Sequence, residues 1–219
     1  MKNVFIIGGA GKVGSRLAQK LSEQGYPPRS LYRHPEQEAS LHALGAIPVP
    51  GNLLELDTPS LAALFSDSDI VVFTAGAGGK GGPEMTHAID GQGLKLAVDA
   101  AKMAGVKRFI LVSAFPESFR AKGMSESFEN YMSVKKLADV YLTETDLDWV
   151  ILRPGTLLDE PGQGKVRAGL AVPYGEISRD DVAWTLAEII NRPAVSRVII
   201  ELTAGSEVIS TAVKHMERL

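Results

Sequence analysis

A tyrosine and a lysine four residues apart, Tyr131 and Lys135, follow a strand that ends at Ser113. On a helix this spacing brings the two side chains to one face. A free tyrosine titrates near about 10, and a neighbouring ammonium lowers that pKa toward the neutral range needed for proton exchange. Ser113 would lie at the carboxyl edge of a sheet, where ligand crevices form. The trio predicts acid–base chemistry on a bound ligand, but the spacing also fits a half-buried tyrosine beside a solvated lysine.

A second cluster with chemical potential is the G-x-x-G-x-x-G turn that follows the apolar run at residues 4–7. Gly8 would let the chain turn out of the strand, and Gly11 would let the backbone approach a pyrophosphate. Gly14 would let the next helix pack closely on the sheet, and the N-terminus of that helix offers N–H groups to phosphates. The turn, with Lys12 and Val13, therefore predicts a dinucleotide site, the alternative being a tight turn without a ligand.

The residue after the second strand indicates which dinucleotide would bind. NAD sites place an acid there for the ribose 2′-hydroxyl, whereas this chain has Arg33. Arg33 could pair with a 2′-phosphate, and Lys12 and Arg16 could add positive charge nearby. The sequence thus favours NADP(H), with NAD(H) as a possible cofactor, unless Arg33 is only a solvated loop residue.

Two further strand ends are expected to line the cofactor. Asn52 and Leu53 follow the third strand, where the adenine should lie. Ala75, Gly76 and Ala77 follow the fourth strand, and their small side chains permit close approach. Either segment could equally be a flexible turn.

Short β-branched runs alternate with helical patterns along the whole chain and position these residues. Strands are expected at 3–7, 30–32, 47–49, 70–73, 109–112, 149–152 and 198–201, and helices at 12–24, 35–44, 59–65, 83–104, 128–144, 179–190 and 207–218. Gly25, Gly45 and Gly105 would end helices, and Ser178 and Ser206 would begin them. The pattern predicts one Rossmann-like domain over 1–219, a doubly wound parallel sheet in three α/β/α layers.

Two segments without such a pattern, 114–127 and 155–176, follow the fifth and sixth strands. Both would lie at the carboxyl edge of the sheet, so we expect them to form the pocket for a small-molecule substrate. Asp180 and Asp181 open the helix after the second segment, where acids complement the helix dipole.

Composition excludes several kinds of function. The chain has 219 residues, of which 45% are hydrophobic and 22% charged, and its net charge is −3, so neither a nucleic-acid nor a membrane partner is expected. Cysteine is absent and the four histidines are scattered, so no metal site is expected. The apolar run at the start is too short for a signal peptide, which favours a cytoplasmic protein.

Several motifs in a fixed order resemble the atypical short-chain dehydrogenase/reductases, specifically small bacterial NAD(P)-binding proteins of the NAD-dependent epimerase/dehydratase and NmrA-like groups. Besides the glycine turn, these are Ile89-Asp90-Gly91-Gln92-Gly93, Ala104-Gly105-Val106-Lys107-Arg108-Phe109, Leu111-Val112-Ser113, Tyr131-Met132-Ser133-Val134-Lys135, Leu152-Arg153-Pro154-Gly155 and Ile177-Ser178-Arg179-Asp180-Asp181-Val182-Ala183. The resemblance implies that Tyr131 protonates a carbonyl oxygen as hydride arrives, and that Ser113 hydrogen-bonds that carbonyl. It implies that Lys135 holds the nicotinamide ribose, and that Pro154 and Gly155 lie beside the carboxamide.

Some residues depart from that pattern. Asp90 stands where epimerase-type relatives often carry Asn, Ser113 is followed by Ala114 rather than by Ser or Thr, and few residues remain for a sugar-binding domain. The expected function is therefore an NADP(H)-dependent oxidoreductase that reduces a small carbonyl or quinone-like substrate. An NmrA-type sensor of the dinucleotide is the alternative, and a nucleotide-sugar epimerase or dehydratase is less favoured. The sequence leaves a monomer and a homodimer both open.

Overall fold

The computed structural model describes residues 2–78, 80–116 and 125–218. Its strands are β1 Val4–Ile7, β2 Arg29–Tyr32, β3 Ile47–Pro50, β4 Ile70–Phe73, β5 Arg108–Val112, β6 Asp148–Pro154, β7 Thr156–Leu158, β8 Lys165–Gly169, β9 Glu176–Ser178, β10 Val198–Ala204 and β11 Glu207–Val208. Its helices are α1 Lys12–Glu23, α2 Glu36–Ala43, α3 Thr58–Leu64, α4 Gly82–Thr86, the π-helix η1 His87–Gly93, α5 Leu94–Met103, α6 Glu126–Thr143, α7 Arg179–Asn191, α8 Ile209–His215 and the 3-10 helix η3 Met216–Arg218.

The main sheet has the order β11-β8-β10-β6-β5-β4-β1-β2-β3, and every pair from β10 to β3 is parallel. The order reverses beside β1, which is the point where open α/β sheets bind ligands. The Rossmann-like, single-domain prediction is confirmed. The sheet is not entirely parallel, however, because β8 runs antiparallel to both β10 and β11.

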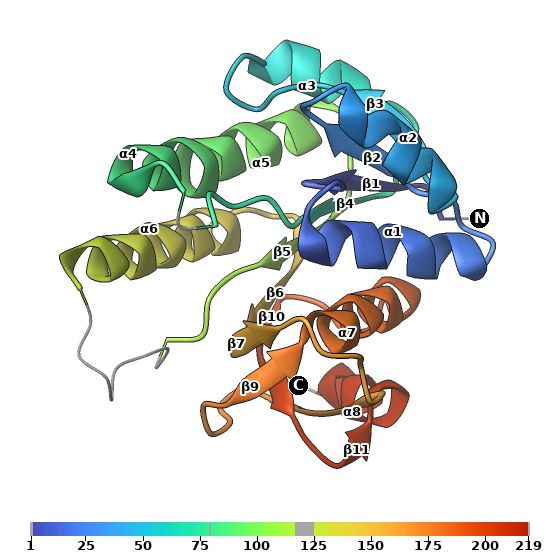
Figure 1. Cartoon of the computed structure of the whole chain (residues 1–219), viewed down its shortest axis with the longest axis vertical. Coiled ribbons are helices and arrows are strands. Elements are labelled where there is room, and N and C mark those ends of the chain that lie inside the picture. Colours follow the sequence, from blue (N-terminus) through green and yellow to red (C-terminus); the bar gives the residue numbers. More distant parts are fainter. Residues whose placement is uncertain (1, 79, 117–124, 219) are drawn as a thin grey trace.

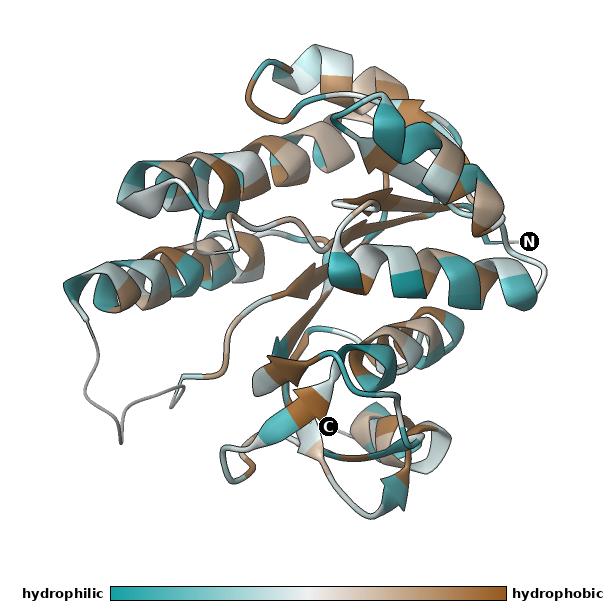
Figure 2. Cartoon of the chain, viewed as in Figure 1, coloured by the Kyte–Doolittle hydropathy of each residue, from teal (hydrophilic) through white to brown (hydrophobic). Residues whose placement is uncertain are grey.

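Side chains alternate between two cores that lie on opposite faces of the sheet. Val4 and Ile6 of β1 belong to the core that is covered by α1, α2, α7 and α8, whereas Phe5 and Ile7 face α3, α5 and α6. Figure 1 shows α1 beside α7 on one side of the strands and α5 beside α6 on the other. The central strands are hydrophobic along their length, as expected for strands buried on both faces (Figure 2). Three layers result.

The segment 155–176 differs most from its prediction, because it is not irregular. It contains β7 and β8 and reaches the first residue of β9, and β7 pairs with β9 in a separate small sheet. These strands are only three to five residues long and are separated by Gly and Pro, so their period was too short to recognise. Of the other predicted pocket segment, residues 117–124 lie outside the described part of the chain.

Most predicted helix ends are confirmed. Gly25, Gly45 and Gly105 all have positive φ, and the Ser178 side chain accepts a hydrogen bond from the Asp180 N–H at the start of α7. Ser206 is not a cap, since the chain first forms β11 and α8 begins at Ile209. The helix expected at 83–104 is interrupted by η1. Among the helices of the described residues, none has the length and apolarity to cross a membrane.

Candidate active site

The turn after β1 is shaped by close backbone packing. Gly8 has a φ of 80°, and the Gly11 N–H donates to the Gly8 carbonyl oxygen at 2.9 Å. A Cβ on Gly14 would lie 2.3 Å from that same oxygen, so no larger residue fits there. The N-terminus of α1 has no side-chain cap and no acid in its first turn. These bare N–H groups at a positive helix end suit a diphosphate.

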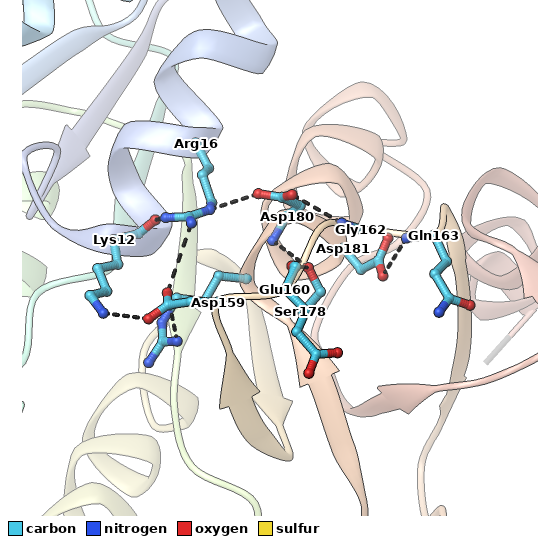
Figure 3. A network of polar contacts seen from close by, with 10 residues as sticks. Lys12, Arg16, Asp159, Glu160, Gly162, Gln163, Ser178, Asp180 and Asp181 are labelled. Atoms are coloured by element: carbon cyan, nitrogen blue, oxygen red, sulfur yellow. Dashed lines mark hydrogen bonds and ion pairs between the residues drawn. The ribbon is translucent and has the colours of Figure 1, made fainter.

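The cations predicted to assist that turn are paired with carboxylates that come from much later in the chain (Figure 3). Lys12 Nζ lies 2.5 Å from Asp159 Oδ2, and Arg16 Nε lies 2.6 Å from Asp180 Oδ1. Arg179 also contacts Asp159, at 2.9 Å. The hydrogen bond from Lys12 and the nearby positive charges lower the pKa of Asp159. Asp159 therefore connects helix α1 to the segment after β7.

The two acids at the start of α7 have a more specific role than the helix dipole that the sequence suggested. Asp180 Oδ2 accepts the Gly162 N–H at 3.0 Å, and Asp181 Oδ2 accepts the Gln163 N–H at 3.0 Å (Figure 3). Asp181 Oδ1 also accepts the Gly164 N–H at 2.7 Å. Backbone donors of this loop are thus paired with carboxylates rather than with other backbone groups. The loop that carries Asp159 is held in place by these bonds.

The remaining predicted cofactor residues lie along the carboxyl edge of β2 to β4. Arg33 is exposed, and its Nε donates to His34 Nε2 at 2.9 Å. The Asn52 side chain is occupied locally, donating to Glu55 and accepting the Leu54 N–H. The other predicted cofactor residues, including Val13 of α1, have contacts inside the protein. The Val13 side chain is buried in the core, Leu53 and Ala75 pack against the second core, and the Ala77 N–H donates to Asp90.

Lys135 and Ser113 are neighbours because the helix α6 is tied to the end of β5. Lys135, which is only 4% exposed, donates from Nζ to the Val112 carbonyl oxygen at 3.1 Å. The next residue, Ser113, donates its N–H to Leu152 at 2.8 Å, yet its buried Oγ has no partner within the described residues. An unpaired buried hydroxyl costs free energy unless a ligand satisfies it. Ser113 Oγ therefore has a free hydrogen-bonding position to offer a ligand.

Tyr131 lies one turn before Lys135 on the same face of α6, half-buried against Phe128, with 5.8 Å between the ring centroids. Burial raises the pKa of Tyr131; Lys135 lowers it, while Asp90 and Asp139 raise it further. The net pKa is raised, which corrects the sequence expectation that Lys135 would bring it down. The physical cause is mainly burial of the phenol, and the two carboxylates add to it by offsetting the lysine charge.

Those two carboxylates, with one arginine, complete a buried polar cluster. Asp90 Oδ1 lies 3.4 Å from Lys135 Nζ, and Asp139 pairs with Arg153 of β6 at 2.8 Å. Burial lowers the pKa of Lys135, but the charges of Tyr131, Asp90 and Asp139 outweigh it, so the net pKa is raised. Asp139 was missed, although its position four residues after Lys135 puts it on the same helix face.

Pro154 and Gly155 end β6 beside this cluster. Gly155 donates its N–H to Leu202, and a Cβ there would lie 2.0 Å from the Gly175 carbonyl oxygen. The glycine is therefore required by the packing of the two loops. Above it, the Tyr174 hydroxyl bonds Thr156, and the Tyr174 ring packs edge-on against Phe115 at 5.4 Å.

A protein-family model described as NAD(P)H-binding matches residues 8–193. The chain belongs to this NAD(P)H-binding family. YhfK of Bacillus subtilis, an uncharacterized sugar epimerase, is 37% identical over 97% of this chain and 99% of its own length. The oxidoreductase ylbE of Lactococcus lactis superposes with a TM-score of 0.85 at 27% identity, over 100% of this chain and 98% of that one. ChuY of Escherichia coli O157:H7, an anaerobillin reductase, superposes at 0.77 with 25% identity, over 93% and 97%.

These relatives confirm the resemblance to the atypical short-chain dehydrogenase/reductases and to epimerase/dehydratase proteins. The bare glycine turn after β1 is our predicted site for the dinucleotide phosphates.

Because Asp159 already holds Lys12, we expect it to compete with those phosphates. Asp159→Asn should tighten NADPH binding about two- to fivefold at low salt, since an exposed ion pair contributes little. The dissociation constant can be measured by NADPH fluorescence. Glu160→Gln removes the same charge from the neighbouring residue, which makes no ion pair in the described structure, and should leave the affinity unchanged. Weaker binding in Asp159→Asn would show that the carboxylate only braces the loop.

Proposed function

We propose that this protein is an NADP(H)-dependent oxidoreductase that reduces a small carbonyl or quinone-like substrate, with Tyr131 as the general acid. The observation that carries the proposal is the buried Ser113 Oγ, which lacks a partner in the described structure and lies next to the carbonyl that anchors Lys135. The oxidoreductase ylbE and the anaerobillin reductase ChuY support the class of reaction.

In the proposed reaction the dinucleotide supplies the hydride that goes to the carbonyl carbon. Tyr131 Oη transfers its proton to the carbonyl oxygen, so that an alcohol forms and a phenolate remains, which regains a proton from water. Ser113 Oγ donates a hydrogen bond to the same oxygen and fixes its direction toward Tyr131. Lys135, held by Val112 and Asp90, faces the cofactor ribose and steadies the phenolate.

The direct test is a panel of ketones, aldehydes and quinones with NADPH, followed by the loss of absorbance at 340 nm. We expect turnover with at least one member of the panel. Saturable NADPH binding without turnover would instead support the sensor function. Conversion of a nucleotide sugar with no net NADPH consumption would support an epimerase.

Arg33 is proposed to select NADPH over NADH. Its guanidinium is exposed and, among the described residues, contacts only the His34 ring through Nε. Arg33→Ala should weaken NADPH binding about 10- to 100-fold, the size of a lost charge-assisted pair, and leave NADH binding unchanged. Arg167→Ala, at an exposed arginine on β8, is the matched control and should change neither constant. If Arg33→Ala weakened NADPH and NADH binding equally, Arg33 would not select between the two dinucleotides.

A further inference from the structure

Asp90 occupies a position where it contacts two parts of the proposed site at once. Its carboxylate is 2% exposed; Oδ2 accepts the Ala77 N–H at 2.9 Å and Oδ1 lies 3.4 Å from Lys135 Nζ. A Cβ on Gly76 would lie 3.1 Å from Oδ1, so the loop after β4 packs directly on this carboxylate. One side chain thus joins the cofactor-side loop to the lysine of α6.

The local backbone explains how this side chain reaches both partners. Asp90 lies in the π-helix η1, which interrupts the α4–α5 run and packs on α6. A π-helical turn is frequent at functional sites. In this chain it is the element that carries the buried acid beside Lys135.

The charges around Tyr131 balance. The cations Lys135 and Arg153 face the carboxylates Asp90 and Asp139, and all four side chains are largely buried. The other charged or titratable groups on elements that pack against α6 have separate partners or are exposed. His87 bonds Asn130, Lys95 and Asp99 contact Tyr141, and Asp148 pairs with Arg108, whereas Glu84 of α4 and Lys102 of α5 are exposed.

We propose that Asp90 is a positioning residue that fixes Lys135 against the Gly76–Ala77 loop and offsets its charge, so that Tyr131 retains its proton for delivery to the substrate. This inference rests on the proposed function. With Asp90 ionised, a neutral Tyr131 leaves the cluster without net charge. With an uncharged residue at position 90 the cluster carries one positive charge, and formation of a phenolate becomes easier. Asp90 therefore sets the pH above which Tyr131 loses its proton and reduction slows.

The first test needs no substrate. Tyr131→Phe is made in each protein compared. Subtracting its titration from that of the same protein with Tyr131 intact isolates the phenolate absorbance of Tyr131. In Asp90→Asn, which keeps the size of the side chain, the Tyr131 titration should move down by about one pH unit. Asp90→Ser should move the Tyr131 titration in the same direction. Asp90→Glu keeps the negative charge and should leave the titration where it is in the unsubstituted protein. An unchanged or upward shift in both neutral variants overturns the proposal.

Asp99→Asn is the matched control, because Asp99 bonds the hydroxyl of a different tyrosine on the same helix. Its hydrogen bond raises the pKa of Tyr141 to about 12. The control should lower the titration of Tyr141 and leave that of Tyr131 unchanged. If it moves both, the effect is a general loss of negative charge and Asp90 has no particular role.

The second test uses the reaction. In Asp90→Asn the pH above which kcat for reduction declines should fall by the same number of pH units as the midpoint of the Tyr131 titration. A shifted Tyr131 titration with an unshifted kcat profile would support the effect of Asp90 on Tyr131 but refute Tyr131 as the proton donor. The two failures are therefore distinguishable, because the absorbance titration reports on Asp90 and the comparison of the profiles reports on the proposed function.

Discussion

Tyr131→Phe is expected to lower turnover about 10²- to 10⁴-fold, the usual contribution of a positioned general acid, while NADPH affinity stays within about twofold. The substitution removes one hydroxyl from a half-buried ring, and that hydroxyl makes no hydrogen bond within the described residues. The Phe128 contact and the helix α6 are preserved, so the fold should be unaffected. Steady-state kinetics on any substrate from the carbonyl panel, together with NADPH fluorescence, measure the two effects.

Tyr141→Phe provides the control on the same helix. Its hydroxyl donates to Asp99 at 2.7 Å, away from the buried cluster, so its removal should leave turnover near that of the parent protein. If Tyr131→Phe retained full turnover, another group would have to supply the proton. If it lost NADPH binding to the same extent as turnover, Tyr131 would be a binding residue rather than an acid.

Gly14→Ala is expected to abolish dinucleotide binding, with an affinity loss of at least about 100-fold. The added Cβ would lie 2.3 Å from the Gly8 carbonyl oxygen and 2.9 Å from Thr74 Oγ1, and the first of these is backbone that cannot rotate away. The strand–helix turn must therefore move, and its N–H groups lose their common direction. Overpacking of this kind also costs about 1–3 kcal/mol of stability.

Gly25→Ala separates this steric effect from the general cost of replacing a glycine. Gly25 has a φ of +83°, and a Cβ there would meet nothing within 4 Å. We expect a stability loss of about 1 kcal/mol from backbone strain and no change in NADPH affinity. Urea denaturation and NADPH titration of both variants give the comparison, and undiminished binding in Gly14→Ala would contradict the assignment of the turn.

The sequence alone was sufficient to predict most of the secondary structure and the Rossmann-like fold. The strands from β1 to β6, the glycine turn and the ends of most helices follow from local patterns: apolar runs of strand length, glycines with positive φ, and a serine cap at α7. These patterns depend on residues close in the chain, and for that reason they can be recognised without a structure. Spacing and strand position indicated the candidate trio, and the family resemblance gave each of its members a role.

The tertiary structure decided what depends on residues distant in the chain. Asp159 comes 147 positions after Lys12, and no local pattern indicated that the two would pair. Asp90 and Lys135 are 45 positions apart, and their contact is created by η1 packing on α6. The pKa of Tyr131 shifts opposite to the sequence expectation for the same reason. Spacing reveals the lysine four residues away, which lowers the pKa, whereas burial of the phenol and the carboxylates brought near it by the fold raise the pKa.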